Sequence, residues 1–81
     1  MAKKIDLRHQ ITLAETFVSN NCEKTIDMDY KKTSHLWALE VSKWCGYEIE
    51  NRAIREAVAK FKVRTKEIAV GIEIYALKRR K

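Results

Sequence analysis

The stretch SHLWALEVSKWCGYEIENRAIREAVAKF, residues 34–61, contains the pattern that decides the fold. Apolar residues recur at helical spacing on both sides of Gly46, which predicts two amphipathic helices joined by a tight turn. Glycine suits the end of a helix, because the left-handed backbone conformation needed there costs glycine little. The second helix is expected to begin near Glu50 or Asn51 and to run to Phe61.

The first of these helices has a broad apolar face. Trp37, Val41 and Trp44 share one side of the helix. Leu36 and Leu39 widen this side. An apolar stripe of this kind is normally buried, so all five residues are expected in the core. The alternative use of two tryptophans is a platform on which nucleic-acid bases stack.

The residues before this stretch predict one more helix and a short strand. Asp6 is a suitable N-cap for a helix over residues 7–20, and Asn20 or Asn21 can end it in the left-handed conformation. Residues 22–33 are polar with isolated apolar positions. A few of them form either a short strand or a loop.

Residues 62–81 allow two interpretations. β-Branched residues alternate with others from Ile68 to Ile74, which favours a strand that bends near Gly71. The same segment also allows a helix over residues 66–79. The sequence therefore predicts an α+β fold, with an all-α four-helix domain as the alternative.

The composition predicts a single globular domain over residues 1–81. The chain has 46% hydrophobic and 35% charged residues, whereas disordered chains have few apolar residues. No apolar run is long enough to span a membrane, and the N-terminus lacks the apolar core of a secretory signal. Two cysteines are few for a secreted disulfide scaffold, so we expect buried or half-buried thiols in a cytoplasmic protein.

No residue set in the sequence is typical of catalysis or metal binding. Cys22, Cys45, His9 and His35 lack the close pairing of a structural zinc site. The chain has no glycine-rich phosphate loop and no local signature of a nucleophile with its base. We therefore expect no enzyme activity, no cofactor and no bound metal.

The positive charge is concentrated in the last part of the chain. The net charge is +6. Residues 1–50 carry seven Lys/Arg and eight Asp/Glu, whereas residues 51–81 carry ten Lys/Arg and three Asp/Glu and end in a basic tail at 78–81. Such asymmetry indicates a polyanionic partner. The alternative is a solvated basic face that only keeps the protein soluble.

The expected order of elements resembles that of winged-helix proteins, which carry a helix-turn-helix. The resemblance rests on Thr25–Met28 as a short strand, residues 33–46 as the second helix, residues 50–61 as the recognition helix and residues 62–75 as a β-ribbon. It implies a three-helix winged-helix-like domain with a short C-terminal β-ribbon. It also implies a DNA-binding regulator of transcription or replication whose recognition helix docks in duplex DNA.

The resemblance places the nucleic-acid-binding residues on the recognition helix and on the basic chain after it. Arg52 and Arg55, one turn apart, are candidates for contacts with base edges, although each can instead pair with a nearby glutamate. Asn51 either pairs with adenine or serves as an N-cap. The complete predicted set is Asn51, Arg52, Arg55, Lys60, Lys62, Arg64, Lys66, Lys78, Arg79 and Arg80.

Other partners fit the same basic half. A two-fold DNA site would suit a homodimer that pairs through Ile68–Ile74. An acidic protein surface is the main alternative to DNA, as for small inhibitors or adaptors encoded by viruses and mobile elements. RNA is a third candidate.

Overall fold

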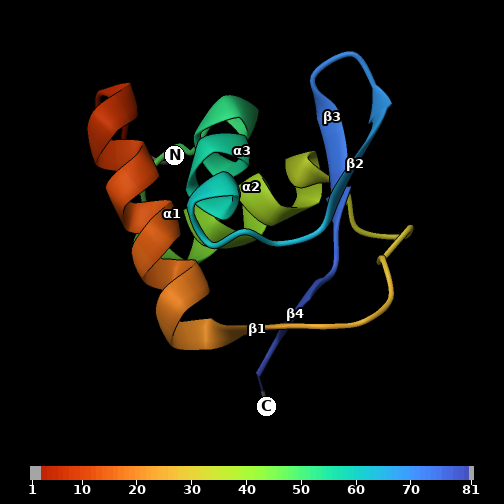
Figure 1. The fold of residues 1–81 in the computed structure, drawn as a ribbon. Helices are drawn as coiled ribbons and strands as arrows, with labels where there is room; N and C mark the ends of the chain where they lie inside the picture. Colours follow the sequence, from red (N-terminus) through yellow and green to blue (C-terminus); the bar gives the residue numbers. More distant parts are fainter. Residues whose placement is uncertain (1–2, 81) are drawn as a thin grey trace.

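Within residues 3–80, which the computed structural model describes, the chain forms three helices and two small antiparallel sheets (Figure 1). The α+β prediction is confirmed, and the all-α alternative is wrong. The helix α3 lies in front of α2, between α1 and the β2–β3 ribbon. The elements are α1 (Leu7–Asn21), β1 (Cys22–Lys24), α2 (Ser34–Cys45), α3 (Asn51–Lys60), β2 (Thr65–Ala69), β3 (Ile72–Tyr75) and β4 (Leu77–Arg79).

Helix α1 starts as predicted and ends differently. The Asp6 carboxylate accepts a hydrogen bond from the His9 backbone N–H at 2.8 Å, which is the expected N-cap. At the other end the cap residue is Cys22, and its backbone is extended. The predicted left-handed end at Asn20 or Asn21 is therefore wrong, because the chain leaves the helix directly into strand β1.

The connection between α2 and α3 follows the sequence prediction. Gly46 has a φ of +81°, and its N–H bonds the Ser42 carbonyl at 2.8 Å. A Cβ added to Gly46 would meet no atom within 4 Å, so the left-handed backbone alone explains the glycine. The Ser42 hydroxyl donates to the Tyr47 carbonyl at 2.6 Å and so fixes the start of the turn.

The C-terminal residues form strands, and the predicted helix over residues 66–79 is wrong. Strands β2 and β3 make an antiparallel hairpin that turns at Gly71, whose φ is +74°. The bend expected at Gly71 is confirmed. A register shift lies between Glu67 and Ala69. An isolated bridge joins Thr33, just before α2, to Ile74 of the hairpin.

The first strand is real but lies earlier than predicted. β1 covers Cys22–Lys24, and it pairs with β4. The resemblance had placed the strand at Thr25–Met28, and these residues lie outside any strand. Pairing explains the difference, because Cys22 is buried and Lys24 aligns with the buried Leu77.

The basic tail expected at 78–81 is bound to the rest of the protein at residues 78–80, the part that the structure describes. Lys78 and Arg79 belong to β4, and the Arg80 backbone N–H donates to the Asn21 carbonyl at 2.7 Å. Lys81 lies outside the described residues. Among the helices of residues 3–80, none has both the length and the apolar character needed to cross a membrane.

The core lies where the three helices meet the strands. Trp37 and Val41 are buried in it, as predicted. Trp44 stacks on Phe17 at a centroid distance of 5.4 Å but remains 43% exposed. Leu36 and Leu39 are 47% and 52% exposed. The prediction that all five apolar residues of α2 are core is therefore wrong for three of them, because no described element covers the outer side of α2.

Candidate nucleic-acid interface

A row of exposed cations leads from the end of α3 into β2, and we call it the basic strip. Its cations alternate with Phe61, Val63 and Thr65, of which Val63 is buried and Phe61 half-buried. Phe61 and Val63 anchor the chain, whereas Thr65 is exposed like the cations on either side of it. Figure 1 shows this connection crossing the front of the molecule. The basic strip consists of Lys60, Lys62, Arg64 and Lys66.

The backbone of the basic strip is held at several points. Lys62 has a φ of +55°, and its N–H bonds the Ala59 carbonyl at 3.2 Å, which ends α3. The Arg64 carbonyl accepts the Ala76 N–H at 2.9 Å. The Arg64 guanidinium in turn donates to the Ile26 carbonyl at 3.2 Å. The strip is therefore a fixed feature of the fold rather than a loose linker.

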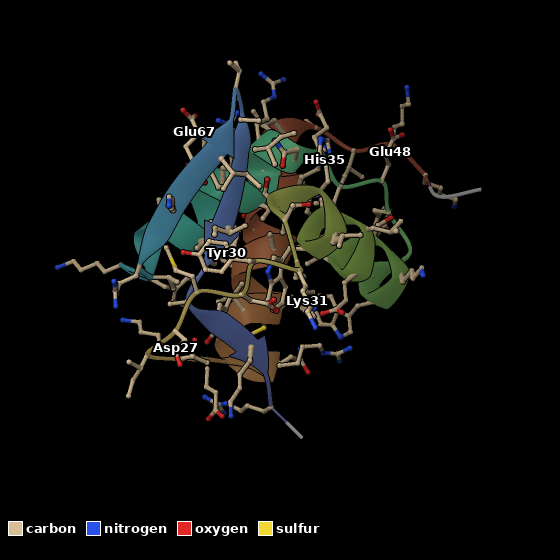
Figure 2. All side chains as sticks on the ribbon, turned by 90° about the vertical axis from the view of Figure 1, so that its right-hand side faces the viewer. Asp27, Tyr30, Lys31, His35, Glu48 and Glu67 are labelled. Atoms are coloured by element: carbon tan, nitrogen blue, oxygen red, sulfur yellow. The ribbon has the colours of Figure 1, made fainter. Side chains whose placement is uncertain are left out.

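The charges of the basic strip are only partly neutralised. Lys60 Nζ lies 3.3 Å from a carboxylate oxygen of Glu15 on α1. Lys66 Nζ lies 5.9 Å from the ring centre of Tyr30, which sits on the ribbon side of the segment before α2 (Figure 2). Lys62, Arg64 and Lys66 form no ion pair with any acidic residue of the described chain. They remain available to an anionic ligand.

The start of α3 offers one exposed cation. The Asn51 side-chain amide donates to the Gly71 carbonyl, which attaches the tip of the ribbon to the helix. Asn51 is thus neither the N-cap, which is Glu50, nor free to pair with a base. Arg52 keeps 59% of its side chain exposed, with Nε 3.6 Å from a Glu50 carboxylate oxygen. Arg52 is the residue of this helix end that a ligand can reach.

Arg55 faces the ribbon instead of solvent. It is half-buried, and its Nε is buried without a hydrogen-bond partner in the described structure. The Tyr75 hydroxyl donates to a Glu73 carboxylate oxygen at 3.0 Å. Burial raises the pKa of Tyr75 well above its usual value, and the Glu73 carboxylate raises it further. The Arg55 charge favours the ionised form of Tyr75 and so lowers its pKa slightly. The Glu73 backbone N–H bonds the Ser34 hydroxyl at 3.1 Å. Helical spacing alone does not predict that Arg55 lies near Tyr75 and Glu73 of the ribbon.

The three remaining predicted cations lie on or next to β4, at the end of the molecule away from the ribbon tip (Figure 1). Lys78 Nζ lies 3.2 Å from Glu23 on the paired strand. Arg79 Nε lies 3.7 Å from Glu40 on α2, and its guanidinium sits 5.1 Å from the Phe17 ring centre. The structure therefore separates these residues from the basic strip.

The cysteines and acidic groups give no second site. Cys22 is buried and Cys45 half-buried, both as free thiols, as the sequence predicts. Burial, with a smaller contribution from Glu40, raises the pKa of Cys22 to about 11. Among residues 3–80, no three His, Cys, Asp or Glu side chains are placed to hold a metal ion.

Comparison of the chain with protein-family models, with curated proteins and with solved structures gave no match. Its function is therefore inferred from its own chemistry and geometry.

Proposed function

We propose that this protein is a small DNA-binding regulator of transcription or replication that docks the basic strip and the start of α3 on duplex DNA. The observation that supports this function is the basic strip itself, four exposed cations at alternate positions on an anchored backbone. Cations that neutralise phosphates release condensed counterions, which drives binding without any sequence preference. The basic strip would therefore supply affinity and orientation.

The order of elements supports a winged-helix arrangement for this docking. A β-hairpin follows α3 directly and would serve as the wing, with α3 as the recognition helix. The hydrogen bond from Asn51 to Gly71 ties the ribbon tip to the first residue of α3. Helix and ribbon would then meet DNA as one unit. Arg52, exposed at the same end, is the candidate for contact with a guanine edge.

Two copies of the protein would pair with each other through β2 and so bind a two-fold DNA site. Every residue of β2 is exposed, and its outer edge pairs with no other strand of the described chain. Ile74 is fully buried, so the apolar residues available for such pairing are Ile68 and Val70, which are 47% and 99% exposed. An exposed strand edge is a template for pairing with a second chain. We place this regulator in the cytoplasm, where free thiols persist.

Fluorescence anisotropy with labelled duplex DNA at two salt concentrations tests the proposal. Lys62→Glu combined with Arg64→Glu should reduce affinity strongly at low salt. It should also flatten the log–log salt slope by roughly 0.9 for each phosphate that the variant no longer neutralises. Lys3→Glu combined with Lys4→Glu changes the net charge equally at exposed positions outside the strip, and should weaken binding much less.

The other partners predicted from the sequence correspond to different outcomes. An absence of duplex binding at low salt would rule out the proposed function. Tighter binding of structured RNA than of duplex DNA would assign the basic strip to RNA. Loss of all nucleic-acid binding together with capture of an acidic protein through Lys62 and Arg64 would favour the adaptor function.

A further inference from the structure

The outer side of α2 carries an apolar groove that the proposed DNA-binding surface does not use. Leu36 and Leu39, one helical turn apart, are about half exposed and form its apolar floor. The segment before α2 forms its other wall, and Lys31 lies on the α2 side of that segment (Figure 2). The groove has a volume of about 450 Å³. It is lined by Asp29, Lys31, Lys32, Leu36, Leu39, Glu40 and Lys43.

The groove is held open by contacts beneath and beside it. Lys32 Nζ lies 2.8 Å from a Glu40 carboxylate oxygen and 3.7 Å from the ring centre of the buried Trp37. The Lys32 backbone N–H bonds the Asp29 carbonyl at 3.4 Å, which closes a turn in the wall. The bridge between Thr33 and Ile74 fixes the wall to the ribbon. Little free energy would therefore be needed to order this surface when a ligand binds.

The rim of the groove is positively charged. Glu40, its acidic residue on α2, has one carboxylate oxygen 2.8 Å from Lys32 and the other 3.7 Å from Arg79. Its charge is thus already compensated within the molecule. Lys31 and Lys43 remain on the rim without an ion pair to any described acidic residue. Asp29 also lines the groove and contributes one negative charge; its side chain accepts the Lys31 backbone N–H at 3.0 Å.

We propose that this groove, the α2 groove, binds an acidic amphipathic helix of another protein. Apolar side chains on one face of such a helix would cover Leu36 and Leu39, and flanking carboxylates would meet Lys31 and Lys43. This is the helix-in-groove mode of recognition. A second copy of the chain does not supply an acidic helix. Its α2 has exposed apolar residues, but the exposed charged residue of that helix is Lys43, and the exposed faces of α1 and α3 are mainly polar or basic. The exposed residues are Arg8, His9, Thr12, Thr16, Ser19 and Asn20 on α1, and Arg52, Glu56, Ala59 and Lys60 on α3.

A synthetic peptide provides the direct test. The probe is a fluorescein-labelled amphipathic peptide of about 16 residues, with leucines at i, i+4, i+7 and i+11, a few glutamates flanking them and alanines elsewhere to favour the helix. Fluorescence anisotropy should show saturable binding. Leu39→Glu should weaken it about tenfold or more, and Lys43→Glu should weaken it less. Both positions are exposed, so far-UV circular dichroism should be unchanged.

Matched controls separate the α2 groove from general electrostatics. A peptide with serine in place of leucine, and one with lysine in place of glutamate, should both fail to bind. The double substitution Lys62→Glu and Arg64→Glu, which disables the basic strip, should leave peptide binding intact. Leu39→Glu should leave DNA binding intact, so failure of one proposal is distinguishable from failure of the other.

Three results would overturn the α2 groove as a docking site. The first is no saturable binding of the acidic peptide. The second is binding that survives Leu39→Glu but is lost when Lys62 and Arg64 are replaced, since the peptide would then be on the basic strip. The third is self-association, measured by sedimentation, that Leu39→Glu abolishes, which would assign the groove to a second copy.

Discussion

At the scale of single residues, one buried glutamine joins segments that are distant in sequence. The Gln10 side chain is 4% exposed. Its amide nitrogen donates to the Ile5 carbonyl at 2.9 Å and to a Glu50 carboxylate oxygen at 3.1 Å. Its amide oxygen accepts the Glu50 N–H at 2.7 Å. Gln10 therefore ties the first turn of α1 to the residue that precedes α3.

Replacing the Gln10 side chain should lower the stability of the protein by more than the size of the side chain suggests. We expect Gln10→Ala to lower the free energy of unfolding by about 2–4 kcal/mol, because it leaves several part-buried polar groups unpaired. Urea unfolding followed by circular dichroism measures this change. Ser19→Ala, at an exposed position of the same helix, should change stability by less than about 0.5 kcal/mol. Equal effects of the two substitutions would refute the role of Gln10.

At the scale of elements, the three helices start in different ways. Asp6 caps α1 through its side chain. Thr33 occupies the equivalent position before α2, with an extended backbone but no side-chain hydrogen bond to the helix. Glu50 precedes α3, and its side chain bonds Gln10 and lies 3.6 Å from Arg52 Nε but caps no backbone N–H of the helix. Tertiary contacts therefore replace local capping at two of the three described helix starts.

This difference predicts unequal costs for two similar substitutions. Asp6→Ala should destabilise the protein by about 1 kcal/mol, because the N–H of His9 loses its acceptor. Thr33→Ala should cost clearly less, because the hydroxyl caps nothing in the structure. Thermal or urea unfolding of both variants, compared in the same buffer, checks the order. A larger effect for Thr33→Ala would mean that its hydroxyl does cap α2 in solution.

At the scale of the whole molecule, two weak acids are buried where the strands meet the helices. Cys22 has its pKa raised from an ordinary value of 9.0 to about 11, chiefly by burial. Tyr75, fully buried, has its pKa raised from an ordinary value of 10.0, again chiefly by burial. In the unfolded chain both groups lose their protons at lower pH than in the folded protein. Rising pH therefore favours unfolding.

We expect stability to be unaffected by Cys22 below pH 9 and to fall between pH 9 and 11. The slope from this thiol is about 1.4 kcal/mol per pH unit, and Tyr75 adds to it above pH 10. Urea unfolding under reducing conditions at several alkaline pH values measures the slope. Cys22→Ala should flatten it, whereas Cys45→Ala should not. A wild-type stability independent of pH in this range would refute the assignment.

Much of the helical architecture was predictable because it depends on local chemistry. Periodicity located the three helices, Asp6 marked a start, and Gly46 and Gly71 marked turns that need a left-handed backbone. Two features of the strands were not predictable. β1 is defined by its pairing with β4. The buried end of β3 is contacted by the segment before α2, where the Asp29 N–H donates to the Tyr75 carbonyl at 3.1 Å.

The sequence by itself therefore determined the helices, the two glycine turns and the concentration of positive charge after Asn51. Only the tertiary structure decided which polar and basic side chains are paired, because the partners of Asn51, Lys60 and Arg79 lie 20 to 45 residues away in the chain. The same holds for the exposed leucines of α2. Spacing shows which residues share a helix face, but burial depends on whether another element covers that face. In a domain this small, nothing in the described chain covers the outer side of α2.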